Sequence, residues 1–363
     1  MTGLAAIAAA TAAVAIAVPA ATAAAAAHPP RNDFHQTNLI SNLTTQHAKV
    51  VDPNLKNPWG LALLPASPLW IADNNSGKAS VYTVAPGGAT TANAGLVVTV
   101  PGAAPTGQVA NAGSGFVVKT KAGMGPALFM FSSESGNITA WSPVADPITG
   151  GKSTATVEAS SKTAVYKGLA IGSTKAGSFI YASNFHDGTV DVWNSSFKAA
   201  HLPGKFKDAH LPAGYAPFGI QELHGYLYVT YALQDKDKHD DVKGPGHGFI
   251  DIYTNNGFLV KRLASRGALN SPWGLALAPT GFGPFPGKLV VGNFGDGKIN
   301  VFGPVSGHFI AGLHNEKGKP IVIQGLWGLL FGTATTGGTK TLLFSAGIHG
   351  EADGLVGSIN ADS

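Results

Sequence analysis

A repeating pattern of short apolar segments dominates the chain. Six segments carry a glycine within an apolar run, and these glycines recur 47 to 61 residues apart, as the steps from Gly60 to Gly107 and from Gly107 to Gly168 show. The six segments are residues 57–63, 104–110, 166–172, 216–223, 271–277 and 326–332. A repeat of this length is typical of the four-stranded blades of a β-propeller.

Each segment is followed by a second apolar run, rich in β-branched and aromatic residues, and by a polar turn that contains glycine. These second runs and turns are residues 69–82, 128–141, 179–193, 227–241, 289–302 and 342–354. Asp-Gly and Ser-Gly at the turns supply the positive φ that tight hairpins need. The pattern therefore predicts an antiparallel hairpin in each unit, and in four units a third strand follows directly.

Two units depart from the repeat. The fourth has an insertion, residues 235–248, before its third strand, and the sixth has a shorter one before the chain ends one strand early. Residues 34–43 have a strand pattern but no repeat of their own, so we expect them to pair with the sixth unit and close the ring. The sequence predicts one all-β domain, residues 28–363, folded as a six-bladed β-propeller.

Composition agrees with many short strands and turns, because the chain has 48 glycines, 23 prolines and only 12% charged residues. The absence of cysteine excludes disulfides and thiol chemistry. The net charge of +4 is small and the basic residues are scattered, so we expect no nucleic-acid partner. No GxSxG, HExxH or Walker motif is present.

Residues 1–27 consist almost wholly of Ala, Val, Ile, Thr and Gly and end in a run of alanines. This composition predicts a cleaved signal peptide and a secreted or extracytoplasmic protein. No Lys or Arg precedes the apolar run, which leaves an uncleaved anchor as the alternative. We expect no membrane span in the mature protein, because no later segment has 18 unbroken apolar residues.

Several longer motifs support the same fold. DPNLKNPWGLAL, NFHDGTVDVW, LNSPWGLALAP and, above all, YALQDKDKHDDVKGPGHGFIDIY resemble a family of uncharacterised secreted bacterial β-propellers, some of which carry PEP-CTERM tails. The resemblance covers roughly residues 36–360. In its repeat, the family is similar to six-bladed NHL-type and TolB-like propellers. The resemblance implies the fold but no activity.

In a propeller, the start of each first strand and the end of each second strand lie at the same mouth of the channel. Loops on a rigid scaffold often carry function. The ligand-binding candidates at this mouth are Asn57, Trp59, Asn184, His186, Phe218, His247, Trp273, Asn293, Trp327 and His349. For the repeated tryptophans the main alternative is packing between blades. A residue that recurs at the same position in several blades is more typical of packing, whereas a ligand-binding residue would more often differ from the repeat.

The insertion is a candidate metal site. Asp235, Asp237, His239, Asp240 and Asp241 offer oxygen and nitrogen ligands for Ca²⁺ or another divalent metal, although no complete EF-hand is present and a solvated loop is the alternative. A second candidate set near the axis is Asp73, Glu134, Asn184 and Asn293. His186, His247 and His349 form a third candidate cluster, for a transition metal or acid–base work.

Three functions fit these features. The first is a binding module that holds a small molecule, a glycan or a protein partner at the mouth without chemistry. The second is a divalent-metal-dependent hydrolase of the lactonase or esterase type, in which the metal polarises a carbonyl or activates water. The third is a polysaccharide lyase that acts through His and Tyr. The sequence favours the first and leaves enzymatic activity open.

Overall fold

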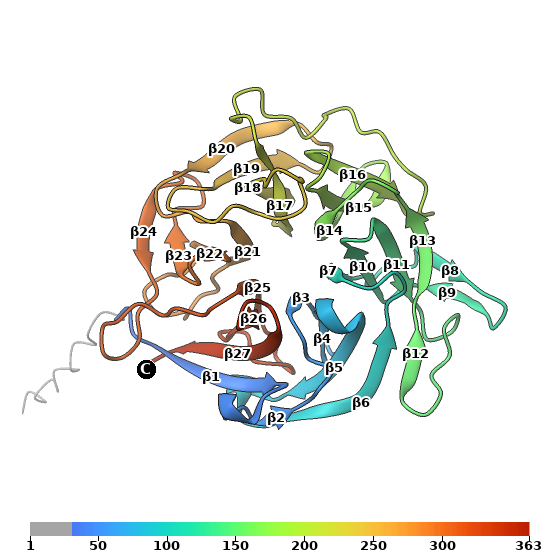
Figure 1. Ribbon diagram of the computed structural model, residues 1–363, viewed down its shortest axis with the longest axis horizontal. Coiled ribbons are helices and arrows are strands. Elements are labelled where there is room, and N and C mark those ends of the chain that lie inside the picture. The colour runs from blue at the N-terminus through green and yellow to red at the C-terminus, as the bar shows by residue number, and fades with distance from the viewer. Residues whose placement is uncertain (1–30, 363) are drawn as a thin grey trace, which may run out of the picture.

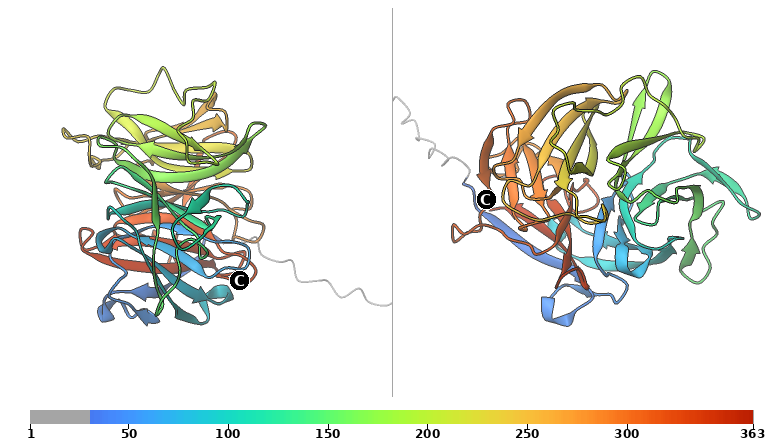
Figure 2. Two further views of the ribbon diagram at one scale, coloured as in Figure 1. Left: turned by 90° about the vertical axis from the view of Figure 1, so that its right-hand side faces the viewer. Right: turned by 45° about the horizontal axis from the view of Figure 1, so that its top comes forward.

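The computed structural model describes residues 31–362, which fold almost entirely into β-strands. Six sheets stand in a ring around a central axis, as Figure 1 shows from above and Figure 2 from two further directions. The predicted six-bladed β-propeller is confirmed. The expected signal peptide, residues 1–27, lies outside the described residues. Within residues 31–362, no helix is long and apolar enough to cross a membrane.

The blades are numbered by their innermost strands, which lie nearest the axis in Figure 1 and contain the repeated glycines. The innermost strands are β3 (Pro58–Ala62), β7 (Pro105–Ala110), β14 (Tyr166–Thr174), β17 (Tyr215–Leu223), β21 (Pro272–Leu277) and β25 (Leu326–Phe331). The second strands are β4 (Leu69–Asp73), β10 (Phe129–Ser133), β15 (Gly177–Asn184), β18 (Tyr226–Leu233), β22 (Leu289–Asn293) and β26 (Leu342–Ile348). The third strands are β5 (Lys78–Val84), β11 (Asn137–Trp141), β16 (Thr189–Asn194), β19 (Phe249–Thr254), β23 (Ile299–Phe302) and β27 (Asp353–Ala361).

Five blades have a fourth, outer strand. These are β6 (Thr91–Thr99), β13 (Thr156–Ser160), β20 (Leu259–Ser265), β24 (Phe309–Gly312) and, in blade six, β1 (Phe34–Ser41). Shorter elements decorate the ring: β2 (Val50–Val51), β8 (Val117–Lys119), β9 (Met124–Pro126), β12 (Lys152–Thr154) and the 3₁₀ turns η1 (Thr44–Gln46), η2 (Asn74–Ser76) and η3 (Pro86–Gly88).

Blade three has three strands, whereas the repeat predicts four. After β16 the chain makes a single bridge, from Trp193 to Ala199, and then runs on without regular structure as far as β17. Pro203 and Pro212 lie in this segment. Proline has no N–H to donate to a ladder, which accounts for part of the missing strand.

The N-terminal strand closes the ring as predicted. β1 pairs with β27 in antiparallel register from Phe34 opposite Ala361 to Ser41 opposite Leu355. Phe34 is fully buried and packs against Phe282 of blade five, with ring centroids 4.8 Å apart. The strand therefore completes blade six and also joins it to its neighbour, which closes the ring.

The repeated glycines set the distance between neighbouring blades at the axis. A methyl group on Gly107 would lie 2.0 Å from the backbone nitrogen of Leu169 in blade three. One on Gly328 of blade six would lie 2.6 Å from the carbonyl oxygen of Trp59 in blade one. The remaining repeated glycines face the next blade at 2.1 to 3.0 Å in the same way. Only glycine allows this close approach.

Hydroxyl groups from second strands bridge these contacts. Ser345 Oγ accepts a hydrogen bond from the Gly328 N–H at 2.9 Å and donates one to the carbonyl of Trp59 at 2.5 Å. Ser183 Oγ donates to the carbonyl of Phe218 in the next blade at 2.6 Å. At these glycines the inner ladder also shifts register, so the hydroxyl satisfies backbone groups that the sheet leaves free.

The seam predicts the effect of a mutation at Phe34. We expect Phe34→Ala to lower the free energy of unfolding by about 3–5 kcal/mol, because it removes a buried ring between two blades. His35 is the matched control, since it is the next residue of the same strand and is exposed; His35→Ala should change stability by less than about 0.5 kcal/mol. Urea unfolding measures both. Equal effects of the two changes would contradict the role of β1.

Candidate functional site

An aromatic cluster closes the channel at one mouth. Trp327 of β25 lies between two parallel rings, Trp59 at 3.5 Å and Phe294 at 3.7 Å between centroids, and Trp273 meets Trp327 edge-on at 5.8 Å. Phe218 of β17 packs on the same indole at 5.8 Å. Trp59, Phe218 and Trp327 are at most 2% exposed. These predicted ligand residues therefore fill space between blades, and the pocket described below lies over three of the rings.

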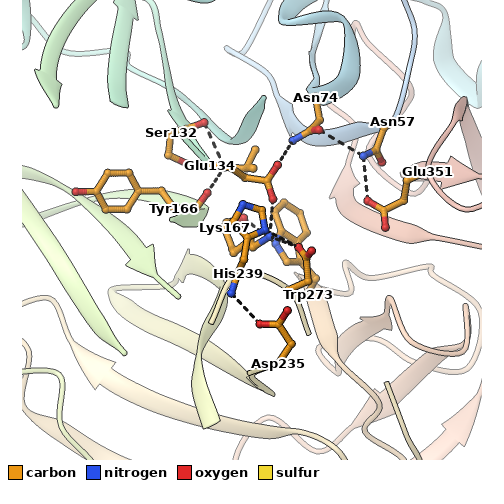
Figure 3. Close-up of polar contacts among 12 residues, drawn as sticks. Asn57, Asn74, Ser132, Glu134, Tyr166, Lys167, Asp235, His239, Trp273 and Glu351 are labelled. Carbon is orange, nitrogen blue, oxygen red and sulfur yellow. Dashed lines mark hydrogen bonds and ion pairs between the residues drawn. The ribbon is translucent and has the colours of Figure 1, made fainter. Parts of the chain in front are cut away.

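A buried lysine lies beside this cluster. Lys167 of β14 is 2% exposed, and its ammonium contacts the carboxylate of Glu134 from blade two and that of Asp240, 3.1 Å away, from the insertion in blade four. Figure 3 shows Lys167 with Glu134 and the neighbouring side chains. Trp273 Nε1 donates to the carbonyl of Lys167 at 2.9 Å, so this residue touches blades two, four and five at once.

The charges of this group stabilise one another. Burial by itself lowers the pKa of Lys167, but the carboxylates of Glu134 and Asp240 outweigh burial and hold that pKa above its usual value. Burial by itself raises the pKa of Asp240, yet the Lys167 ammonium and His239 bring it below its usual value. At neutral pH the site therefore holds a charged lysine between two carboxylates.

Amide side chains extend the network toward blades one and six. Asn74 Nδ2 donates to Glu134 at 2.9 Å, and Asn57 Nδ2 donates to Glu351 at 3.0 Å, as Figure 3 shows. Asn57 Oδ1 accepts a hydrogen bond from Trp327 Nε1 at 3.0 Å. Asn57, a predicted ligand residue, thus fixes both a carboxylate and a ring of the aromatic cluster.

A pocket of about 230 Å³ lies over the cluster, and we call it the mouth pocket. Its lining residues are Trp59, Lys167, Asp240, Asp241, Lys243, Phe294, Trp327 and Glu351. Aromatic rings form one side and five charged side chains the rest. Burial raises the pKa of both Asp241 and Glu351, and nearby lysines oppose that rise.

Of the five predicted metal ligands of the insertion, His239 and Asp240 contact each other, with His239 Nδ1 3.0 Å from Asp240 Oδ1, whereas the side chains of the other three have different partners. Asp235 Oδ1 accepts the backbone N–H of His239 at 2.9 Å, and Asp237 lies 3.7 Å from Lys236 at the surface. Asp240 contacts Lys167, and Asp241 lines the mouth pocket. Residues 31–362 contain one group of three acidic or histidine ligands within 4.8 Å of one another: Glu134, His239 and Asp240.

The predicted axial set is also dispersed. Asn184 donates to Asp187 at 2.9 Å and Asn293 donates to Asp296 at 3.0 Å, so each amide stabilises its own turn. Asp73 is fully buried within blade one, and burial raises its pKa well above the usual range. Only the fourth member, Glu134, belongs to the group around Lys167.

The three predicted histidines do not gather into a cluster. His186 Nδ1 lies 3.2 Å from Asp187 in its own turn, and His349 Nδ1 lies 3.0 Å from Asp353. His247 Nδ1 lies 2.8 Å from the carbonyl of Val242, within the insertion. Each imidazole stabilises a local turn.

Sequence reasoning missed Lys167 and Glu351, although a signal for the first was present. Lys167 precedes a repeated glycine, where blades one, five and six have Trp59, Trp273 and Trp327. A lysine at a position that holds tryptophan in three other blades departs from the repeat. Such a departure is the signal by which the sequence can indicate a functional residue. Glu351 lies in the short insertion of blade six, and its sequence context gives no comparable signal.

Comparisons with known proteins agree with this fold. No family model matches the chain. Two uncharacterised proteins of Acanthamoeba polyphaga mimivirus are similar: R648 is 32% identical over 89% of this chain and 79% of its own length, and L690 is 31% identical over 89% and 85%. A streptogramin B lyase structure, 11% identical, superposes with a TM-score of 0.50 over 91% of this chain and 97% of that one, which shows the fold alone.

The sequence resemblance led us to expect bacterial relatives, whereas the relatives found are viral. Each alignment covers most of both chains rather than a single motif. This chain belongs to the same family of uncharacterised proteins as mimivirus R648 and L690.

Proposed function

We propose that the protein is a binding module that holds a small molecule, or the end of a larger one, in the mouth pocket. The observation that carries the proposal is the pocket itself, in which aromatic rings from blades one, five and six meet five charged side chains. Ligand sites are commonly concave, with apolar walls and a few placed polar groups. At about 230 Å³ the pocket is small, so the bound part has few atoms.

The position of the pocket also supports binding. Lys167 replaces a packing residue of the repeat, and three further lining residues, Asp240, Asp241 and Lys243, belong to the insertion of blade four. A fold that needed only to close its ring would require neither feature. The departures from six-fold repetition therefore coincide with the pocket, as expected for a ligand site on a scaffold.

The proposal includes a secreted or extracytoplasmic location. Its support is the apolar, alanine-rich composition of residues 1–27, which is typical of a signal peptide. Mass spectrometry of the N-terminus of the protein recovered outside the cytoplasm tests the proposed location, because a cleaved signal peptide would leave a chain that begins near residue 28.

Indole NMR signals test the binding proposal. We expect at least one compound, in a set of neutral sugars, amines, carboxylates and amino acids, to shift the indole N–H signals of Trp59 and Trp327, which line the pocket. Trp70 and Trp141 are internal controls, because they pack together at 4.9 Å between blades one and two. Single Trp→Phe variants assign the signals. Binding that shifts only the control indoles, or no response to any compound, would contradict the proposal.

A metal-dependent hydrolase is the second candidate function, because Glu134, His239 and Asp240 lie within ligand distance of one another. The Lys167 ammonium already contacts both carboxylates, and a divalent cation would have to displace this buried charge.

We therefore expect EDTA and Ca²⁺ to leave the thermal unfolding temperature unchanged, and metal analysis of the purified protein to show no stoichiometric ion. A bound ion that is lost in Glu134→Gln but kept in Asp237→Ala would instead support the hydrolase. Asp237 is the matched control, since its carboxylate lies at the surface beside Lys236.

A further inference from the structure

We infer that the mouth pocket binds an organic cation, such as an alkylammonium group, and that the side chain of Lys243 occupies the cation position when no ligand is bound. The inference rests on the proposed function and deepens it, because it names the ligand class of the same pocket.

The first observation is the position of the Lys243 ammonium. Its Nζ lies 3.9 Å from the ring centroid of Phe294, which is itself 3% exposed and stacked on Trp327. A cation over an aromatic face is attracted by the negative potential of that face. The chain's own lysine thus shows where a positive group is stabilised in the pocket.

The second observation is the surplus of carboxylates around that position. Lys167 pairs with both Glu134 and Asp240, and Asp241 and Glu351 line the same pocket, so four acidic side chains lie beside two lysines, Lys167 and Lys243. Asp241 Oδ2 is buried without a hydrogen-bond partner. Burial raises the pKa of Asp241 and of Glu351, and the Lys243 ammonium opposes that rise in both. Two partly buried carboxylates beside an aromatic face favour a cation over a neutral or anionic ligand.

The third observation is that Lys243 can leave without moving the loop. The backbone on either side is held, because Val242 N–H donates to the carbonyl of Leu233 at 2.7 Å and Gly244 N–H donates to Asn270 Oδ1 at 2.8 Å. Lys243 itself is exposed. Lys167, by contrast, is buried and bonded to two carboxylates, so it remains part of the site.

The test compares choline with its neutral isostere 3,3-dimethyl-1-butanol, at constant ionic strength, in the wild type, Lys243→Met and Lys243→Arg. Removing the competing ammonium should tighten choline binding by roughly tenfold in Lys243→Met, with no gain for the neutral alcohol. Lys243→Arg keeps a cation over the ring and should behave like the wild type. The Trp59 indole signal reports binding, and thermal unfolding checks that each variant folds.

The outcomes separate this inference from the function on which it rests. An equal gain for choline and the alcohol, or no choline binding to Lys243→Met while another compound shifts the Trp59 signal, would overturn the cation inference and leave the binding function standing. No response of the Trp59 signal to any compound, in any of the three proteins, would overturn both.

Discussion

The close approach of the six innermost strands is the constraint on which the ring depends. At Gly107 a single methyl group would collide with the next blade, at 2.0 Å, and the aromatic cluster around Trp327 seals the channel above. The mouth pocket lies beyond this packed region, where turns and insertions project past the strands.

Lys167 connects the elements that meet at this mouth. Its buried ammonium joins Glu134 of blade two to Asp240 of the insertion, while its carbonyl accepts a hydrogen bond from Trp273 of blade five. A buried charge without partners would cost several kcal/mol, so Lys167 depends on Glu134 and on Asp240, whose own side chain is 67% exposed. The same contacts keep the insertion over the aromatic cluster, and the space left between them is the mouth pocket.

The sequence predicted the fold well because strand period, turn glycines and axial glycines are all local signals that repeat. It also predicted the closing strand, at residues 34–43, because this strand pattern has no repeat of its own; the structure forms it over Phe34–Ser41. The site was predicted less well. Asp235, Asp237 and the histidines bond within their own turns, and proximity in sequence did not reveal this. Glu134 and Lys167 are 33 residues apart and meet only because adjacent blades bring their ends to one mouth.

Hydrogen exchange of the insertion in Asp240→Asn tests the central claim, that the ion pair with Lys167 holds residues 235–248 over the mouth. The account predicts faster exchange at the amides of Asp235, Lys238 and His239, which are hydrogen-bonded within the insertion, and unchanged exchange in β18. Asp237→Asn, in the same loop but at the surface, should leave all of them unchanged. Unaltered protection in Asp240→Asn would contradict the account.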